Sequence, residues 1–344
     1  MKIRTAILGY GRSGGGMHAG SLENNSDAFE VAAVCDIRPE RLDLAAKRFG
    51  CKLYEDYREM LDKERLDLVS IVTRTDQHAS MTCDCLAAGV SVLVTKPWAV
   101  NETEARRMVE AAREAAARHP RRLLLPWLPA RWGSDLRRLK RILKDKVIGN
   151  VFMIRRAVST FATRNDWQTE RRYGGGYLLN WGPHIVDTPI VLKGSRVSSV
   201  YGRMKQTINP GDVEDVFLAV MNLADGTIVQ AEFTIAVESL PSWFIQGDEG
   251  TVVVREHSLR IYRRIPNRPE DPTDRGAMTV SEEGVIEERL ENELYGDPDT
   301  IYKEVGMALR GEREFPVAPA DALELTRVLD AIRVSSEQNR VVML

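Results

Sequence analysis

A lysine and a histidine, Lys96 and His184, are the side chains of this sequence best placed for proton-transfer chemistry. Lys96 follows the β-branched run 90–95, and Pro97 comes next. A lysine at the end of a buried strand is partly desolvated, which favours an anionic or hydrogen-bonding partner such as a developing alkoxide. Pro97 fixes the turn through either a trans or a cis bond. Taken alone, Lys96 is more simply interpreted as a surface lysine.

His184 lies in a segment introduced by three consecutive glycines, Gly174 to Gly176. The segment is predicted to be helical, so Asn180, His184 and Asp187 fall at i, i+4 and i+7 on one face. The imidazole fits a general base and a structural histidine equally well. A metal site is a third interpretation, but asparagine is a poor ligand and the sequence holds no second ligand cluster. We therefore expect no metal.

A glycine-rich turn near the start of the chain predicts a dinucleotide cofactor. Gly9-Tyr10-Gly11-Arg12-Ser13-Gly14 matches the fingerprint G-x-G-x-x-G, with a predicted strand before it and a predicted helix after it. Gly9 permits the tight turn, Gly11 lets the pyrophosphate approach the backbone, and Gly14 lets helix and strand pack closely. Amides at the helix start would hold the phosphates. Arg12 and Ser13, within the turn, belong to the same predicted cofactor site.

An acidic residue, Asp36, ends the second predicted strand 22 residues after Gly14. The fingerprint expects such a residue about 20 positions on, where its carboxylate accepts hydrogen bonds from the adenosine ribose and repels a 2′-phosphate. Asp36 therefore favours NAD as the cofactor, while the nearby Arg38 leaves NADP open.

Residues 1–123 alternate β-branched runs with helical patterns, which is typical of β-α-β units around a parallel sheet. Helix boundaries are marked by Pro39 and Gly50, and by the capping boxes of Asp56 with Glu59 and Asn101 with Glu104. Six strands are predicted, at 3–8, 31–35, 52–53, 68–72, 90–95 and 123–127.

The pattern changes after residue 123. A basic amphipathic helix is predicted at 134–146, with a solvated face preferred over nucleic-acid binding. Alternating stretches follow at 151–158, 197–205, 213–223, 227–237, 251–254 and 259–263. They predict an open, largely antiparallel or mixed sheet with a hairpin at Asp225-Gly226. An exposed loop at 266–279 and a final helix at 320–338 complete the prediction.

The expected fold class is therefore an α/β Rossmann domain, residues 1–123, followed by an α+β domain, residues 124–344. Lys and Arg number 48 and Asp and Glu 50, so no net field favours nucleic acid or a membrane. No apolar run approaches the roughly 20 residues that cross a bilayer, and the start lacks the apolar core of a signal peptide. The four cysteines have no paired C-x-x-C spacing. We expect reduced thiols, a cytoplasmic location, and small molecules and copies of the chain itself as partners.

Over essentially its whole length the sequence resembles the Gfo/Idh/MocA family of NAD(P)-dependent sugar and cyclitol dehydrogenases. The resemblance rests on the glycine turn with Asp36, the segment 73–78, Lys96-Pro97, Ile148-Gly149 and the run 174–187. It implies hydride transfer between a sugar carbinol carbon and C4 of nicotinamide, with the substrate held between the two domains.

The resemblance also assigns roles to single residues. Lys96 matches the lysine that holds the reacting hydroxyl, and His184 matches the histidine that takes its proton. Thr73, Thr75 and His78 match positions that line the cofactor, and Pro97 matches the proline beside the nicotinamide.

Two positions depart from the family pattern. The usual Glu-Lys-Pro is here Thr95-Lys96-Pro97, so a carboxylate near the cofactor is missing. The aspartate expected before the histidine is Asn180, whose amide can bind a sugar hydroxyl but cannot act as a base. Either His184 works without that carboxylate, or the chemistry differs.

Further polar and aromatic residues suit a polyol site, and arginine could clamp a carboxylate or phosphate. An exposed charged loop is an equally good interpretation of the segment before the glycine triplet. The residues expected to bind substrate are Asn180, Trp167, Arg164, Arg171, Trp181 and Arg131.

Three functions remain open on this basis. The first is an NAD(P)-dependent dehydrogenase of a sugar, sugar acid, cyclitol or glycoside. The second, prompted by Asn180, is a glycosidase or lyase that oxidises its sugar transiently without net redox change. The third is a non-catalytic NAD sensor. A homo-oligomer, dimer or tetramer, is expected through the open sheet face.

Overall fold

The computed structural model describes residues 1–264, 284–291 and 293–344. The loop predicted at 266–279 therefore lies outside the described residues. The chain divides into two units. The first holds residues 1–129, 166–180 and 297–330, and the second holds residues 130–165, 181–296 and 331–344.

A parallel sheet of six strands forms the first unit, in the order β3-β2-β1-β4-β5-β6. The order reverses between β1 and β4, the point beside which doubly wound sheets bind ligands at the carboxyl ends of their strands. The strands are β1 Ile3–Leu8, β2 Phe29–Cys35, β3 Lys52–Tyr54, β4 Leu68–Ile71, β5 Ser91–Thr95 and β6 Leu124–Trp127.

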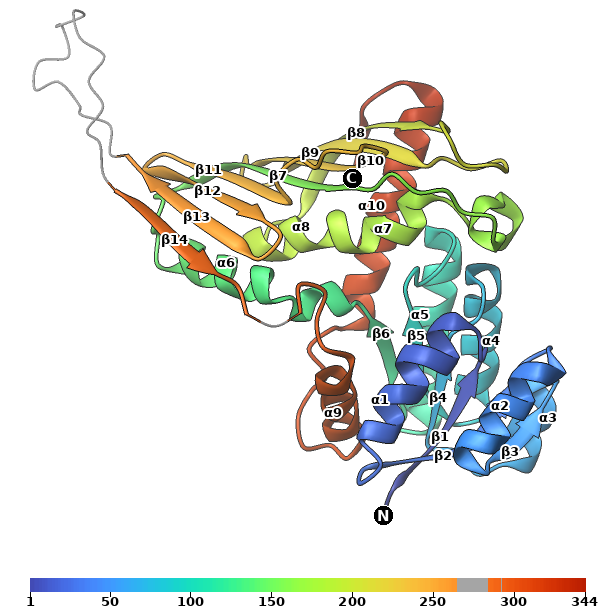
Figure 1. Ribbon diagram of the computed structural model, residues 1–344. Coiled ribbons are helices and arrows are strands. Elements are labelled where there is room, and N and C mark those ends of the chain that lie inside the picture. The colour runs from blue at the N-terminus through green and yellow to red at the C-terminus, as the bar shows by residue number, and fades with distance from the viewer. Residues whose placement is uncertain (265–283, 292) are drawn as a thin grey trace, which may run out of the picture. The chain divides into compact units, whose positions relative to one another are not determined.

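Helices cover both faces of this sheet, because right-handed crossovers place the helices of its two halves on opposite sides. On one face α4 packs against α5, and on the other α1 packs against α9 (Figure 1). Asn101 caps α5 by accepting a hydrogen bond from the Glu104 amide, as predicted. The helical elements are η1 Arg12–His18, α1 Ala19–Asn24, α2 Pro39–Phe49, α3 Tyr57–Lys63, α4 Thr75–Ala87, α5 Glu102–Arg118, α9 Pro298–Leu309 and most of α10 Pro319–Gln338.

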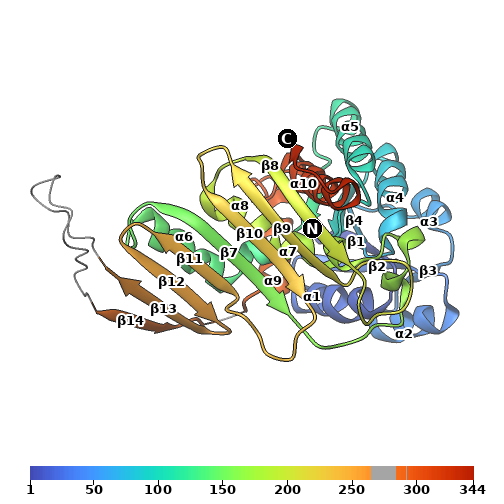
Figure 2. The ribbon, with the colours of Figure 1, turned by 90° about the horizontal axis from the view of Figure 1, so that it is seen from above.

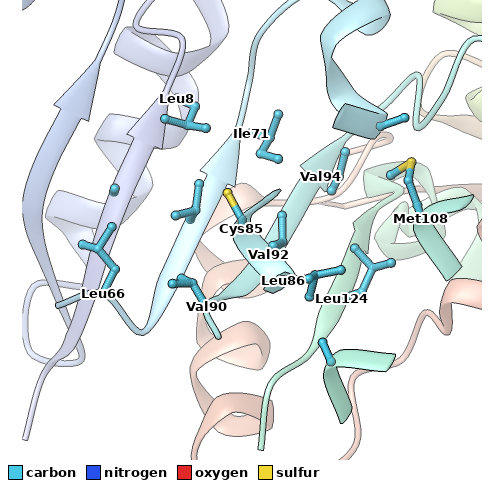
Figure 3. Close-up of a cluster of buried hydrophobic side chains, with 14 of the residues drawn as sticks. Leu8, Leu66, Ile71, Cys85, Leu86, Val90, Val92, Val94, Met108 and Leu124 are labelled. Atoms are coloured by element: carbon cyan, nitrogen blue, oxygen red, sulfur yellow. The ribbon is translucent and has the colours of Figure 1, made fainter. Parts of the chain in front are cut away.

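The core of the first unit lies between the sheet and α4 and α5. Val92 and Val94 of β5 meet Leu86 and Cys85 of α4 there, all at most 1% exposed (Figure 3). Burial raises the pKa of the Cys85 thiol, so this cysteine is a packing residue without thiolate character. The strands are thereby fixed, and with them the loops at their carboxyl ends.

A mixed sheet of nine strands forms the second unit, in the order β14-β13-β12-β11-β7-β10-β9-β8-β15. Among the described strands of this second sheet, only β7 and β10 pair in parallel. The strands are β7 Val151–Ser159, β8 Val197–Lys205, β9 Val216–Leu223, β10 Ile228–Thr234, β11 Trp243–Gly247, β12 Gly250–Arg255, β13 Ser258–Arg263, β14 Val285–Arg289 and β15 Val342–Met343.

One face of this sheet is covered by helices, and α6 and α8 lie behind it in Figure 2. Burial alternates accordingly along β10, where Val229, Ala231 and Phe233 are fully buried and Ile228 is exposed. The helical elements associated with this unit are η2 Pro129–Trp132, α6 Ser134–Lys144, α7 Tyr177–Ile185, which begins in the first unit, and α8 Asp187–Lys193.

The predicted fold class is confirmed: a parallel Rossmann sheet followed by a unit with a mixed sheet. Several elements were not predicted, namely β11, β14, β15 and α9. Strand β9 begins at Val216 and not at residue 213, because the Asp215 carboxylate turns the chain by accepting hydrogen bonds from the amides of 207–209. The helix predicted through Asp187 breaks at Val186, and Asp187 begins α8.

Candidate functional site

The glycine turn of the first unit is built so tightly that side chains cannot replace Gly9 or Gly14. Gly9 has φ of +88°, and a Cβ on it would lie 2.7 Å from the carbonyl oxygen of Val72. A Cβ on Gly14 would lie 1.9 Å from the carbonyl oxygen of Gly9. The following segment starts as a π-helix, Arg12–His18, whose wide turns contain Gly15 and Gly16. Glycine is thus required where strand and helix approach each other.

Asp36 lies at the end of β2 beside this turn, and only 5% of it is exposed. Its Oδ2 accepts hydrogen bonds from the Tyr10 amide at 2.7 Å and from Arg41 Nη1 at 3.2 Å. Its Oδ1 accepts from the Arg38 amide at 3.0 Å. The carboxylate is therefore fixed at the edge of the turn and paired with a guanidinium.

The loops after β4 and β5 are tied together by His78 of α4. Its Nδ1 lies 2.8 Å from the carbonyl oxygen of Pro97, and its Nε2 lies 3.2 Å from that of Thr73. Burial lowers the pKa of His78, against the smaller opposing effect of these carbonyls. The His78 ring thus lies between the two loops. Within the loop after β5, the Lys96-Pro97 peptide bond is cis.

Thr75, at the start of α4, has a buried hydroxyl for which the described part of the chain supplies no hydrogen-bond partner. Buried hydroxyls are normally paired, so this oxygen is suited to a ligand or to an ordered water. It lies next to Gly174, on which a Cβ would come within 2.7 Å of the Thr75 Cβ and 2.6 Å of Val100 Cγ1. The glycine triplet is therefore held against the loops after β4 and β5.

Lys96 contacts the beginning of α7. Its Nζ donates to the backbone carbonyl oxygen of Asn180 and to the side-chain Oδ1 of the same residue, both at 2.8 Å. Asn180 is thus a neutral acceptor for an ammonium group at the position where the family has a carboxylate. Helix α7 carries His184 one turn further on, and residues i and i+4 share a helix face.

His184 belongs to a cluster of four aromatic rings in the second unit. Its ring centroid lies 5.7 Å from that of Trp181 and 5.4 Å from that of Tyr295. Trp181 stacks on Phe233 of β10 with centroids 5.3 Å apart and an angle of 24°. Phe233 is fully buried, whereas Trp181 and Tyr295 are partly exposed and present flat apolar surface of the kind on which the C–H face of a sugar packs.

Arg131 forms a two-pronged ion pair with Asp187, with its Nε and Nη2 each 2.8 Å from a carboxylate oxygen. The side chains are 13% and 4% exposed. This pair joins η2 to the start of α8, so the guanidinium predicted to bind substrate is already held by a carboxylate. Its substrate-binding role stays a prediction.

The other predicted substrate residues lie before the glycine triplet. The Arg164 amide donates to Asn209 Oδ1 at 2.6 Å in the second unit. Trp167 lies in η3 Trp167–Thr169 and Arg171 in η4 Arg171–Tyr173, both in the first unit.

Among the described residues, no group of three or more His, Cys, Asp or Glu side chains could hold a metal ion. None of the described helices is long and apolar enough to span a membrane.

Reasoning from the sequence missed Arg41, Phe233 and Tyr295. Arg41 could have been noticed as a basic residue five positions after Asp36. Phe233 is a buried strand residue among many, and Tyr295 follows a segment without periodicity, so neither carried a signal.

Comparison with known proteins agrees with this architecture. A model described as "Oxidoreductase family, NAD-binding Rossmann fold" matches residues 3–119, and one described as "GFO/IDH/MocA C-terminal domain" matches residues 136–253. The chain is an NAD-binding oxidoreductase in class. It belongs to the Gfo/Idh/MocA family, as the sequence predicted.

Three known proteins show what the chain is similar to in sequence and in fold. The scyllo-inositol 2-dehydrogenase (NADP(+)) IolW of Bacillus subtilis is 22% identical, with 99% of this chain and 96% of the relative covered. The structure of an NAD-binding protein from Listeria innocua is 26% identical, covers 100% of this chain and 97% of its own, and has a TM-score of 0.83. The WlbA dehydrogenase from Bordetella pertussis, in complex with NADH and UDP-GlcNAcA, has a TM-score of 0.82 at 22% identity, covering 100% and 99%.

Proposed function

We propose that this oxidoreductase transfers a hydride between a hydroxyl-bearing carbon of a sugar, sugar acid, cyclitol or glycoside and nicotinamide. The observation that supports it is the pairing of Lys96 Nζ with Asn180 on α7, the helix that carries His184 one turn later. Two of the relatives support it, because IolW is a scyllo-inositol 2-dehydrogenase and the WlbA structure contains NADH with UDP-GlcNAcA.

In this proposal the glycine turn and Asp36 hold the dinucleotide, and Thr73, Thr75, His78 and Pro97 line its nicotinamide end. The bound nicotinamide supplies an acceptor or donor of hydride at C4. The buried Thr75 hydroxyl has no partner among the described residues, which suits a hydrogen bond to the cofactor.

Lys96 and His184 supply the proton chemistry. The Lys96 ammonium donates to the reacting hydroxyl and stabilises the alkoxide that develops as hydride leaves the carbon. His184 accepts the hydroxyl proton during oxidation and returns it during reduction. Trp181 and Tyr295 flank that imidazole and offer apolar surface to the sugar ring.

The test is a change of nicotinamide absorbance with a panel of polyols and keto-sugars. General acid–base groups contribute about 100- to 10,000-fold in rate, so Lys96→Ala and His184→Ala should lose about that much turnover while still binding NAD. Lys63→Ala and His119→Ala, the matched substitutions of exposed residues, should keep the turnover of the wild type. Full turnover in the Lys96 and His184 variants would exclude these roles.

Asn180 supports a second candidate, a glycosidase or lyase that oxidises its sugar transiently. A tightly held cofactor would then return to its starting state in each cycle. Native mass spectrometry showing NAD retained through purification, with glycoside cleavage and no net NADH, would favour it. Freely exchanging cofactor that is reduced stoichiometrically would favour the dehydrogenase.

We also propose that copies of the chain associate through the uncovered face of the nine-stranded sheet. Apolar side chains on several strands are exposed there, including Tyr201 at 36%, Ile228 at 39% and Tyr262 at 38%. Burying such a face is favourable. Light scattering should give a dimer or tetramer for the wild type, and Ile228→Glu should shift it towards monomer.

A further inference from the structure

A hollow of about 440 Å³ lies beside the glycine turn, within the first unit. Three of its lining residues are arginines, and the others include the backbone of the glycine segment. The lining residues are Tyr10, Gly11, Arg12, Gly15, Gly16, Arg41, Leu44 and Arg48. Its charge suits an anion.

Asp36, the residue expected to exclude a 2′-phosphate, is neutralised at the edge of this hollow. Arg41 Nη1 lies 3.2 Å from one carboxylate oxygen and 3.4 Å from the other. The amides of Tyr10 and Arg38 donate to the same two oxygens. A carboxylate with a guanidinium against it repels a phosphate much less than an isolated one.

Arg41 is also the arginine placed to meet an incoming ligand. Its Nη1 lies 3.5 Å from where a Cβ on Gly11 would stand, over the glycine that the dinucleotide approaches. Arg48, by contrast, is committed to Glu23 at 2.7 Å and to the carbonyl oxygen of Gly15 at 2.8 Å. Arg41 therefore lies where the ligand approaches, whereas Arg48 is held by Glu23 and by the backbone of Gly15.

We propose that this hollow receives the 2′-phosphate of NADP and that Arg41 is the residue that admits it. With NAD, the Arg41 guanidinium stays on Asp36. With NADP the guanidinium keeps its Nη1 on Asp36 and donates from its other N–H groups to the phosphate, while the amides of Tyr10 and Arg38 continue to hold Asp36. The chain then binds both cofactors with similar affinity, although Asp36 alone predicts NAD. Binding of the 2′-phosphate involves only the dinucleotide site and does not depend on the sugar substrate.

Calorimetric titration of the full chain with 5′-AMP and with adenosine 2′,5′-bisphosphate tests it without turnover. In the wild type the bisphosphate should bind as tightly as 5′-AMP or more tightly. Arg41→Ala removes charge-assisted hydrogen bonds, so its affinity for the bisphosphate should fall by about 10- to 100-fold. Its affinity for 5′-AMP should change by less than about threefold.

Arg48→Ala is the matched control, because it removes the same charge from the same hollow and should leave the ratio of the two affinities unchanged. Titration with 5′-ADP separates the 2′-phosphate from the pyrophosphate as the group bound. If Arg41→Ala weakens 5′-ADP as much as the bisphosphate, the hollow serves the pyrophosphate and the proposal fails. It fails equally if wild type binds the bisphosphate more than about tenfold more weakly than 5′-AMP. Circular dichroism confirms that each variant is folded.

Discussion

The contact between Lys96 and Asn180 can be measured as a coupling free energy. Lys96 Nζ reaches both the side-chain Oδ1 and the backbone oxygen of Asn180 at 2.8 Å. Asn180→Ala removes the first contact and leaves the second. A hydrogen bond to a charged group stabilises a fold by about 1.5 to 3 kcal/mol, and this one is only partly buried. We therefore expect a coupling of about 1 to 2 kcal/mol in the free energy of unfolding.

The assay is urea unfolding of wild type, Lys96→Ala, Asn180→Ala and the double variant, followed by circular dichroism. Asn101 supplies the control, because its Oδ1 caps α5 through the Glu104 amide. Asn101→Ala combined with Lys96→Ala should be additive within about 0.5 kcal/mol. Additivity of the Lys96 and Asn180 substitutions within the same margin would refute the contact on which the proposed chemistry rests.

Three further predictions concern the fold around the site. Arg131→Met leaves Asp187 buried without its ion pair and should lower the free energy of unfolding by about 3 to 5 kcal/mol in urea titration. Arg113→Met, which breaks a solvent-exposed pair, should leave the unfolding midpoint essentially unchanged. Burial lowers the pKa of His18 to about 3, so its contribution to stability is complete above pH 6.5 and falls by about 1.4 kcal/mol per unit as pH drops from 6.5 to 3. Urea titrations between those pH values should show that slope, and His18→Gln should lack it. Gly14→Ala should abolish NAD binding in calorimetry, because the added Cβ would meet the carbonyl oxygen of Gly9. Gly20→Ala is the control and should keep NAD binding, because its Cβ would have no neighbour closer than 3.7 Å. Equal NAD binding by both variants would contradict the close packing inferred for the turn.

The six-stranded sheet of the first unit and the helices between its strands could be predicted from the sequence because their signals are local. Strand β1 has the predicted bounds, and Gly50 ends α2 in a left-handed conformation as a glycine after a helix should. The fingerprint turn is a short-range pattern with fixed spacing, so its position followed from the sequence alone.

The second unit contains strands that the local sequence pattern does not predict. Strand β14, Val285–Arg289, is a short edge strand with three charged residues, and nothing in such a run distinguishes it from a loop. Strand β11 is only five residues long and follows directly on an exposed segment. Both become strands because neighbouring strands pair with them, which a single segment does not reveal.

Side-chain pairings across long separations were likewise out of reach. Arg131 and Asp187 were assigned to substrate binding and to a helix face, and their ion pair over 56 residues emerges only in the folded chain. The pair of Arg41 and Asp36 was not predicted either, although the two residues are only five positions apart. The rotamer of Arg41 decides whether its guanidinium points to solvent or to the carboxylate. Residue types predicted a polar site, and the fold decides which of those residues already have partners.

The most direct test of the proposed chemistry follows the hydride itself. Wild type is incubated with NADH deuterated at C4 and a pool of keto-sugars, and the products are read by mass spectrometry. We expect a polyol carrying one deuterium on the newly formed carbinol carbon, with about 100- to 10,000-fold less of it formed by Lys96→Ala or His184→Ala. Deuterated polyol formed equally well by both variants, or a product whose new hydrogen comes from solvent, would contradict it.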